Sequence, residues 1–191
     1  MNYITIATFI VSMLMSPAFA AASTFQNPVQ GEIYNQENQP ELYCLAMNIY
    51  HEARAEPIAG QYAVSDVVIN RVYDTRYPNT ICEVVLQGPV RESWKTRKDP
   101  DLLSEERTYY PVRHKCQFSW YCDGKSDEPN RNSKAWSKAI RHASIVMGES
   151  INLDVTDGAT HYHASYVRPA WAKTKTKTTR IDKHIFYRWE K

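Results

Sequence analysis

The sequence has little excess charge of either sign. Its 191 residues carry 23 Lys and Arg against 21 Asp and Glu, which gives a formal net charge of +2. Domains that bind nucleic acid usually have a pronounced basic surface, so this composition argues against a nucleic-acid partner. The sequence also has no internal repeat. Its length suits one domain of ordinary size with its own core.

A hydrophobic run of the length that spans a membrane is missing as well. The apolar run that starts at Tyr3 is too short for a transmembrane helix with its own flanks. It ends in Ala18-Phe19-Ala20, an A-x-A cleavage signal, although no Lys or Arg precedes the run. We therefore predict that residues 1–20 are a secretory signal peptide; an uncleaved anchor is the alternative. The mature protein would be periplasmic or secreted, with no stable membrane association.

Closely spaced cysteine pairs of the kind that bind zinc are absent too. The four cysteines, Cys44, Cys82, Cys116 and Cys122, contain no C-x-x-C spacing. An even number of cysteines in an exported chain instead predicts two disulfides, and four cysteines allow three pairings. Our prediction pairs Cys82 with Cys116 and Cys44 with Cys122. A local bridge between Cys116 and Cys122 is the main alternative.

The patterns along the chain predict one domain after a polar linker. Residues 21–39 form the flexible linker, and residues 40–191 form a single catalytic domain with a charged excursion at 88–115. Apolar residues at helical spacing predict helices from Pro40 to about Arg54, over 58–73 and over 133–148, with a short helix near 81–87. A surface helix is predicted within 98–107, and strands are predicted in 158–167 and 182–190. Asp66 lies outside the apolar stripe of its helix and is predicted to be solvated.

The segment "MNIYHEARAEP" places one carboxylate at the edge of an apolar helix face. Glu52 follows Leu45 by seven residues and Ile49 by three, so all three lie on neighbouring positions of the helix surface. Partial burial raises the pKa of a carboxyl group, as a general acid requires near neutral pH. The alternative is a structural ion pair with Arg54 or another arginine. Glu56 comes directly before a proline and is predicted to be a loop residue or a cap of the next helix.

Several blocks of the sequence occur in the same order as in a known protein family. These are "IYHEARAEPIAGQYAVSDVVINRV", "YPNTICEVV", "CQFSWYCDG", "GATHYHASYV" and "HIFYR". Together they resemble the cell wall hydrolase family typified by the spore-cortex-lytic enzymes, over about residues 42–188 without the charged excursion. The resemblance implies an α+β, lysozyme-like or lytic-transglycosylase-like fold, with a helical lobe that carries the catalytic Glu and a small C-terminal β portion. His51 and Ala55 depart from the family, which often has Gly at both positions.

The resemblance also implies an activity. It identifies Glu52 as the catalytic residue of an exported enzyme that cleaves the bond between N-acetylmuramic acid (MurNAc) and N-acetylglucosamine (GlcNAc) in peptidoglycan. A single acid/base suits a lytic transglycosylase, which leaves 1,6-anhydro-MurNAc ends and needs no cofactor. The alternatives are a hydrolytic muramidase, a zinc amidase built on His161, His163 and His184, and a non-catalytic peptidoglycan-binding module. We expect the protein to act on glycan strands as a monomer.

The matched blocks supply candidate substrate-binding residues. These are Gln61, Asn70, Phe118, Ser119, Tyr162 and His163. Each type of side chain also has a structural alternative. Gln61 and Asn70 can bridge helix ends, Phe118 can pack in the core and Tyr162 can be a buried phenol.

Overall fold

The computed structural model describes residues 37–148 and 154–190. The predicted signal peptide and nearly all of the predicted linker lie outside these residues. The described helices are α1 (Pro40–Ala53), α2 (Ile58–Tyr73), α3 (Ile81–Val85), α4 (Trp94–Arg97) and α5 (Lys134–Gly148). The strands are β1 (Val90–Glu92), β2 (Tyr109–Pro111), β3 (His161–Ala164), β4 (Thr176–Ile181) and β5 (His184–Arg188). In these described ranges, no helix is long and apolar enough to cross a membrane.

Helix α1 begins and ends where the sequence predicts. Pro40 occupies the first turn, where its missing N–H costs nothing. The helix ends at Ala53, and the N–H of Glu56 donates to the Ala53 carbonyl at 2.9 Å before Pro57 turns the chain into α2. The predicted apolar stripe is buried, with Leu45 and Ile49 fully inside. This stripe sets the orientation of the whole helix, and so of Glu52 at its last turn.

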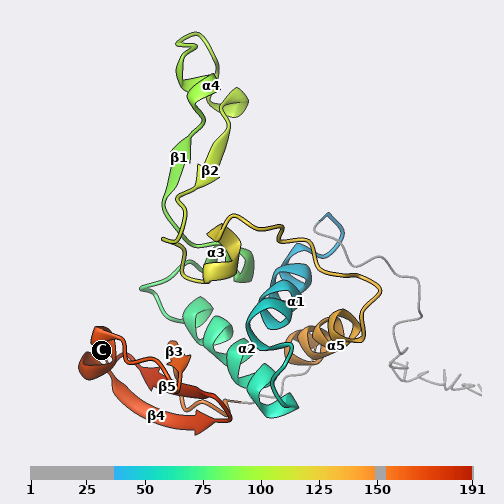
Figure 1. Cartoon of the computed structure of the whole chain (residues 1–191), viewed down its shortest axis with the longest axis vertical. Coiled ribbons are helices and arrows are strands. Elements are labelled where there is room, and N and C mark those ends of the chain that lie inside the picture. The colour runs from blue at the N-terminus through green and yellow to red at the C-terminus, as the bar shows by residue number, and fades with distance from the viewer. Residues whose placement is uncertain (1–36, 149–153, 191) are drawn as a thin grey trace, which may run out of the picture. The chain divides into compact units, whose positions relative to one another are not determined.

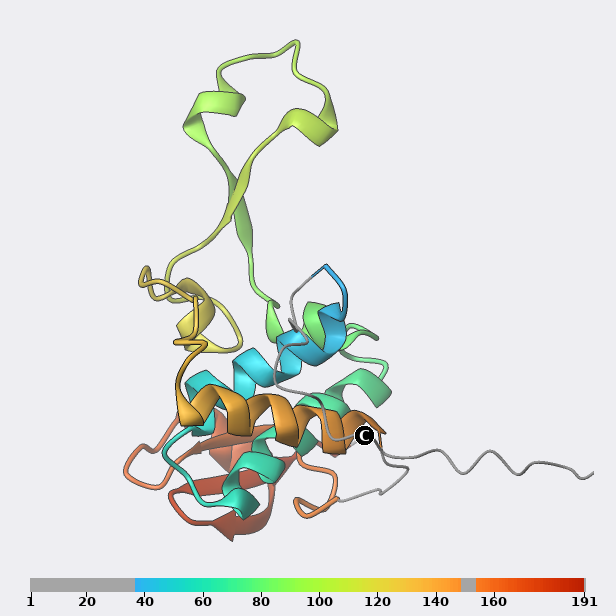
Figure 2. The same cartoon turned by 90° about the vertical axis from the view of Figure 1, so that its right-hand side faces the viewer.

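Helix α2 is buried on two faces. Val68 belongs to the main core, which is formed with side chains of α1, α3 and α5. Ala63 and Val67 instead pack against Ala159 and Phe186, in and beside the sheet. Figures 1 and 2 show α2 between the other helices and the strands. Helix α2 therefore joins the helical part to the C-terminal β portion.

The C-terminal strands form one antiparallel sheet in the order β3-β5-β4. In its register Tyr162 lies opposite Phe186, and His163 lies opposite Ile185. The strands predicted from β-forming residues in the tail are therefore present, and so is the predicted small β portion. Strand β3 lies at an edge of this sheet, where its side chains can line a pocket.

The charged excursion is a β-hairpin rather than a surface helix. Strands β1 and β2 pair in antiparallel register, and the pair, with α4 near its far end, extends away from α1, α2 and α5 in both views (Figures 1 and 2). The helix predicted within 98–107 is only a three-residue 3₁₀ turn, Ser104–Glu106. Pro100 disfavours a helix through this stretch. Arg107 folds the segment back on itself, because its Nη1 donates to Glu92 at 2.8 Å and its Nη2 to the Leu102 carbonyl at 3.1 Å.

The structure contains two disulfides, but our predicted pairing is wrong. Cys44 pairs with Cys82, with 5.2 Å between the Cα atoms, and Cys116 pairs with Cys122. The second pair is the local bridge that the sequence left open as an alternative. Helices α1 and α3 pack together in the main core, which brings Cys44 and Cys82 within bridging distance. Helical periodicity does not report that contact.

The prediction for Asp66 is also wrong. Its side chain is buried, and its Oδ2 accepts a hydrogen bond from the Val155 N–H at 2.7 Å. The error has a physical cause: helix α2 is covered on two faces, so a residue outside its main apolar stripe need not face water.

Candidate active site

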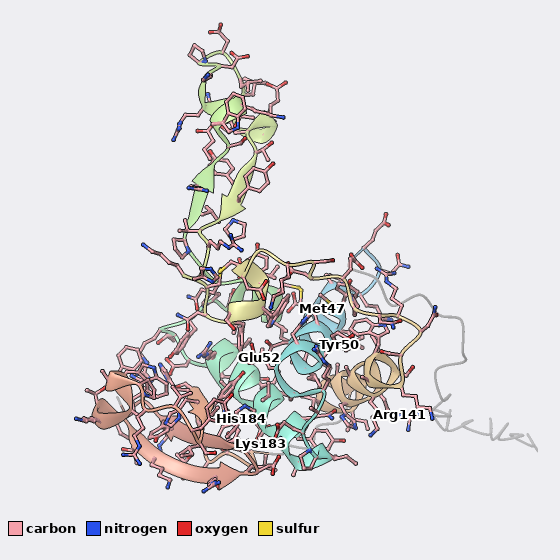
Figure 3. All side chains as sticks on the ribbon, in the orientation of Figure 1. Met47, Tyr50, Glu52, Arg141, Lys183 and His184 are labelled. Atoms are coloured by element: carbon pink, nitrogen blue, oxygen red, sulfur yellow. A yellow bond between two sulfur atoms is a disulfide. The ribbon has the colours of Figure 1, made fainter. Side chains whose placement is uncertain are left out.

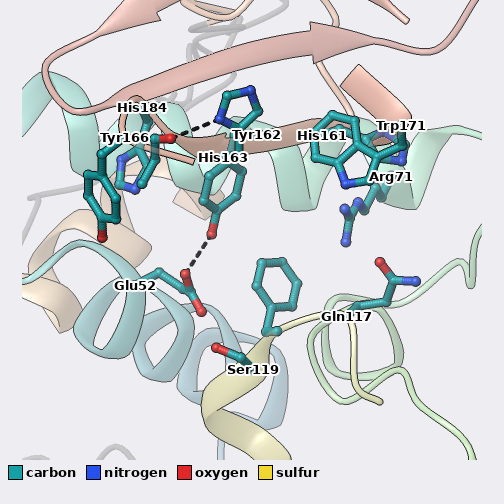
Figure 4. A pocket seen from close by; sticks show the side chains of 12 residues that line it. Glu52, Arg71, Gln117, Ser119, His161, Tyr162, His163, Tyr166, Trp171 and His184 are labelled. Atoms are coloured by element: carbon teal, nitrogen blue, oxygen red, sulfur yellow. Dashed lines mark hydrogen bonds between the residues drawn. The ribbon is translucent and has the colours of Figure 1, made fainter. Parts of the chain in front are cut away.

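A pocket of about 430 Å³ opens beside the last turn of α1. Its walls come from α1, α2, the chain around the 3₁₀ helix η2 (Ser119–Cys122), and β3 with the chain that follows it. The lining residues are Glu52, Arg71, Gln117, Phe118, Ser119, His161, Tyr162, His163, Ala164, Tyr166, Trp171 and His184. Figure 4 shows Glu52 toward one side of this space and Arg71 with Gln117 toward the other.

Glu52 accepts a hydrogen bond from a tyrosine of the sheet. The Tyr162 hydroxyl donates to Glu52 Oε2 at 3.0 Å. Burial raises the pKa of the Glu52 carboxyl, and the Tyr162 hydrogen bond and the Arg71 charge partly offset that rise. The predicted structural alternative, an ion pair with Arg54, is not formed: the Arg54 guanidinium lies 5.0 Å from the Tyr50 ring instead. Glu52 therefore has the environment of a proton donor.

Tyr162 is positioned by the sheet. Its ring contacts the rings of His184 and Phe186, with centroid distances of 5.1 and 5.6 Å. Burial and then the neighbouring Glu52 raise the pKa of the Tyr162 hydroxyl well above its ordinary value. The hydroxyl therefore stays protonated and continues to donate to Glu52 across the working pH range.

A polar anchor positions Phe118 and Ser119 against α1. The Trp120 indole Nε1 donates to the buried Asn48 side chain at 3.1 Å, and the His51 ring stacks on Trp120 at 4.5 Å. Phe118 is 3% exposed and belongs to the main core, which is its predicted structural alternative, although it also lines the pocket; Ser119 is exposed. Both predicted residues are thus brought to the same pocket as Glu52.

The histidines of β3 make protein contacts inside the pocket. His163 lies 3.0 Å from the Tyr187 hydroxyl through Nε2 and 2.9 Å from the Ala164 carbonyl through Nδ1. Burial, then the positive charge of Arg71, lowers the pKa of His161 to about 3, so its ring is neutral. Within the part of the chain that the structure describes, no group of three or more His, Cys, Asp or Glu side chains is arranged to hold a metal ion.

Two predicted binding residues are placed elsewhere. Gln61 is 3% exposed; its Nε2 donates to the Glu56 carbonyl at 3.0 Å, and its Oε1 lies 2.7 Å from His142 Nδ1. Asn70 donates to the Ala159 carbonyl at 3.0 Å. Neither side chain lines the Glu52 pocket. Their contacts are the structural bridges that the sequence left open as the alternative.

The sequence did not identify several lining residues as candidates. Arg71, Gln117, Tyr166 and Trp171 all line the pocket. A signal existed for Arg71, because it shares the apolar face of its helix with Val67 and Val68, an unusual place for a charge. Gln117 and Tyr166 lie in turns or loops and Trp171 lies in the short 3₁₀ helix Ala170–Thr174, where no periodic pattern indicates which way a side chain faces.

Comparison with known proteins links this architecture to one family. The model of the family described as Cell Wall Hydrolase matches residues 55–187 and so begins just after Glu52. The structure is also similar to the catalytic domain of the germination-specific lytic transglycosylase SleB from Bacillus anthracis. The TM-score is 0.52 at 25% identity, over 78% of this chain and 95% of that one. The predicted α+β, lytic-transglycosylase-like fold is therefore confirmed.

Shorter sequence matches point the same way. The spore cortex-lytic enzyme of Bacillus cereus is 38% identical over 53 residues, which are 28% of this chain and 20% of that enzyme. The enzyme of the same description from Bacillus subtilis is 36% identical over 47 residues, 25% of this chain and 15% of that enzyme. The matched segment thus spans a fifth or less of these relatives.

Proposed function

Since this chain belongs to the cell wall hydrolase family, we propose that it cleaves the MurNAc–GlcNAc bond of peptidoglycan strands as a lytic transglycosylase. One observation carries the choice of reaction. Among the described residues that line the pocket, Glu52 is the only carboxylate, and burial raises its pKa. A glycosidase that activates water uses two carboxyl groups on either side of the bond, whereas an intramolecular attack needs only one acid/base.

In the proposed reaction Glu52 acts twice. Its proton passes to the bridging oxygen as the bond to C1 of MurNAc breaks, and the substrate's N-acetyl group stabilises the developing positive charge. The Glu52 carboxylate then takes the proton of the MurNAc C6 hydroxyl as that oxygen bonds to C1. The products are a 1,6-anhydro-MurNAc end and a free GlcNAc hydroxyl, and Glu52 is again protonated. Tyr162 supports the carboxylate between the two steps through its hydrogen bond.

The rest of the pocket suits a sugar chain. Phe118 and Trp171 are aromatic rings in its lining, and Ser119 adds an exposed hydroxyl beside them. Aromatic faces pack against the apolar faces of sugar rings, while nearby polar groups fix orientation. We assign Phe118, Ser119, Tyr162 and His163 to substrate binding on this basis. Peptidoglycan strands are the proposed partner of a monomeric enzyme.

The proposed compartment is the periplasm or the exterior of the cell. Residues 1–20 would direct export and be removed, residues 21–39 would serve as a linker, and residues 40–191 would form the catalytic domain. The two disulfides suit an oxidising compartment, where such bonds persist.

Digestion of purified sacculi tests the proposed reaction. Mass spectrometry of the released fragments should find 1,6-anhydro-MurNAc ends, one water lighter than hydrolytic products, and EDTA should leave the rate unchanged. Fragments with only reducing MurNAc ends would identify a muramidase. Free stem peptides with intact glycan strands would identify an amidase and direct attention to His161, His163 and His184. A protein that binds sacculi without releasing fragments would be a binding module.

A further inference from the structure

The pocket contains a buried positive charge without a matching carboxylate. Arg71 is 5% exposed, although it lines the pocket from the last turn of α2. No carboxylate among the described residues forms an ion pair with its guanidinium, and its Nη1 has no hydrogen-bond partner there. Buried charges in proteins are normally paired, because an unpaired one is costly. Arg71 departs from that pattern inside a ligand-sized space.

The contacts that Arg71 does make fix its direction. Its Nε donates to the Thr160 carbonyl at 2.8 Å. Its guanidinium carbon lies 5.2 Å from the centre of the Tyr77 ring and 5.3 Å from that of Phe118. These contacts hold the plane of the guanidinium and leave Nη1 without a hydrogen-bond partner among the described residues. His161 beside it carries no charge and does not compete for an anion.

We propose that the Arg71 end of the pocket is a carboxylate-binding subsite, which takes a carboxylate on the muramic acid substituent of the glycan. An arginine presents its N–H groups in a fork that matches a carboxylate. In a peptidoglycan strand, carboxylates occur on the stem peptide and, where the peptide has been removed, on the lactyl group of MurNAc. The inference rests on the proposed function, because it assumes a MurNAc-containing substrate in this pocket.

The positions of Glu52 and Arg71 fit separate roles, with Glu52 at the reacting bond and Arg71 at the substrate carboxylate. Figure 4 shows Glu52 and Arg71 on separate sides of the pocket, with Gln117 beside Arg71. The carboxylate that binds Arg71 would therefore not be the group that reacts at Glu52. Recognition at Arg71 would select strands with a free carboxylate and set the register of MurNAc at Glu52.

The test compares four glycan substrates. They are intact peptide-bearing strands, strands stripped of peptide by an amidase, and both preparations after methyl esterification of their carboxylates. Wild-type protein should show a kcat/KM about ten- to a hundredfold lower on the esterified form of its preferred strand, the range expected for hydrogen bonds to a charged group. Loss of rate on stripping the peptide would identify the stem peptide as the carboxylate source. A gain of rate on stripping would identify the lactyl group, because its carboxylate is free only after the peptide has been removed.

Variants of Arg71 distinguish recognition of the substrate carboxylate from a purely structural role of this residue. Arg71→Gln should act on free and esterified strands at similar rates, with the loss mainly in KM. Arg71→Lys keeps the charge without the fork and should retain a smaller preference. Arg141→Gln is the matched control, since Arg141 is exposed on α5 and away from Glu52 in Figure 3. It should keep the wild-type preference.

The results that would contradict the subsite, the role of Arg71 and the proposed function differ from one another. Equal wild-type rates on free and esterified strands would overturn the subsite while leaving the glycosidic activity intact. An Arg71→Gln variant that is slower on every substrate but keeps the wild-type preference would reduce Arg71 to a structural link between α2 and Thr160. If Arg71→Gln does not fold, the rates of the wild type and of Arg71→Lys on free and esterified strands still test the subsite. No fragment release from any substrate would instead reject the proposed function itself.

Discussion

At the scale of single residues, the surroundings of Glu52 shift the pKa of its carboxyl in opposite directions. Burial favours its protonated form, while the Tyr162 hydroxyl and the Arg71 charge favour the carboxylate. The proposed reaction needs both forms in turn, first a proton donor and then a proton acceptor. A pocket that strongly favoured only one form would slow the other half of the cycle.

Replacement of Glu52 by Gln should abolish most activity without affecting the fold. The amide keeps the size of the side chain and removes the transferable proton, so the rate on sacculi should fall by roughly a hundredfold or more. Glu56→Gln is the comparison, because Glu56 is close in sequence but does not line the pocket. Fragment release followed by chromatography measures both. A similar loss in the two variants would indicate that a pair of carboxylates shares the catalysis.

Tyr162→Phe should shift the pH dependence of activity upward. The protonated form of Glu52 is the active acid, so kcat/KM should fall as the pH rises through the pKa of Glu52. The Tyr162 hydrogen bond lowers that pKa, and its loss should raise it. The fall in kcat/KM should then occur at higher pH than in the wild type. Tyr73→Phe, at a tyrosine that is 84% exposed, should leave the profile unchanged. A downward shift for Tyr162→Phe would contradict the assignment.

At the scale of elements, helix α2 is tied to the following chain by buried polar groups. Asp66 accepts from Val155, and Asn70 and Arg71 donate to the Ala159 and Thr160 carbonyls. These bonds fix the segment that leads into β3, and so the position of Tyr162 opposite Glu52. The site depends on this junction as much as on its own residues.

Stability should decrease with rising pH because of Asp66. Burial raises the pKa of its carboxyl to about 7, whereas in the unfolded chain it titrates near its ordinary value. Between about pH 4 and 7 the unfolded chain has lost this proton and the folded protein retains it. The Asp66 contribution to stability is therefore present below this range and is lost as the pH rises through it.

Asp66→Asn checks this expectation through thermal unfolding at pH 5 and pH 8. The amide oxygen can still accept from Val155 and carries no charge at either pH. The variant should gain stability relative to wild type at pH 8, by up to about 1.4 kcal/mol for each unit of pKa displacement removed. Asp101→Asn, at an exposed position, is the control. If the stability difference between variant and wild type is the same at pH 5 and pH 8, another group controls the pH dependence.

The two disulfides should differ in their effect on stability. The Cys44–Cys82 bridge has a sequence separation of 38 and ties α1 to α3, whereas Cys116–Cys122 has a separation of 6. Removal of the longer bridge by a double Ala substitution should cost about 2–5 kcal/mol of unfolding free energy. The shorter bridge restrains less of the unfolded chain and should cost less. Urea denaturation of both variants measures the difference, and a larger loss for Cys116–Cys122 would contradict this order.

At the scale of the whole molecule, the β1–β2 hairpin is nearly independent of the catalytic part. Among the described residues, the side-chain hydrogen bonds of residues 92–109 stay within that segment. The root of the hairpin is held by Val112 N–H to the Pro89 carbonyl and by Gln117 N–H to the Gln87 carbonyl. The Glu52 pocket therefore depends on the root of the hairpin and not on its tip.

Replacement of residues 92–109 by Asn-Gly should leave the catalytic part folded. The new turn would join Arg91 to Tyr110, which lie opposite each other in the ladder, and Asn-Gly suits a two-residue hairpin turn. The melting temperature should change by only a few degrees, and the type of fragment released from sacculi should not change. Loss of cooperative unfolding would show that the tip stabilises the rest of the domain.

The sequence by itself determined the local elements and the family. Apolar spacing defined α1, α2 and α5, Pro57 separated the first two, and β-forming residues marked the C-terminal strands. The position of Glu52 at the edge of a buried stripe could also be read from seven-residue spacing. These features depend on short-range geometry, which the order of residues encodes directly.

Only the tertiary structure decided which distant side chains meet. The pairing of Cys44 with Cys82, the burial of Asp66, and the partners of Gln61 and Asn70 follow from how α1, α2, α3, α5 and the sheet pack. The hairpin at 88–115 follows from the pairing of β1 with β2, which are separated by a long connection. Arg71 is the sharpest case. Its charge on an apolar helix face was visible in the sequence, but its lack of a carboxylate partner among the described residues depends on every element around it. Contacts between segments far apart in the chain leave no periodic pattern in either segment, because each is set by the packing of both.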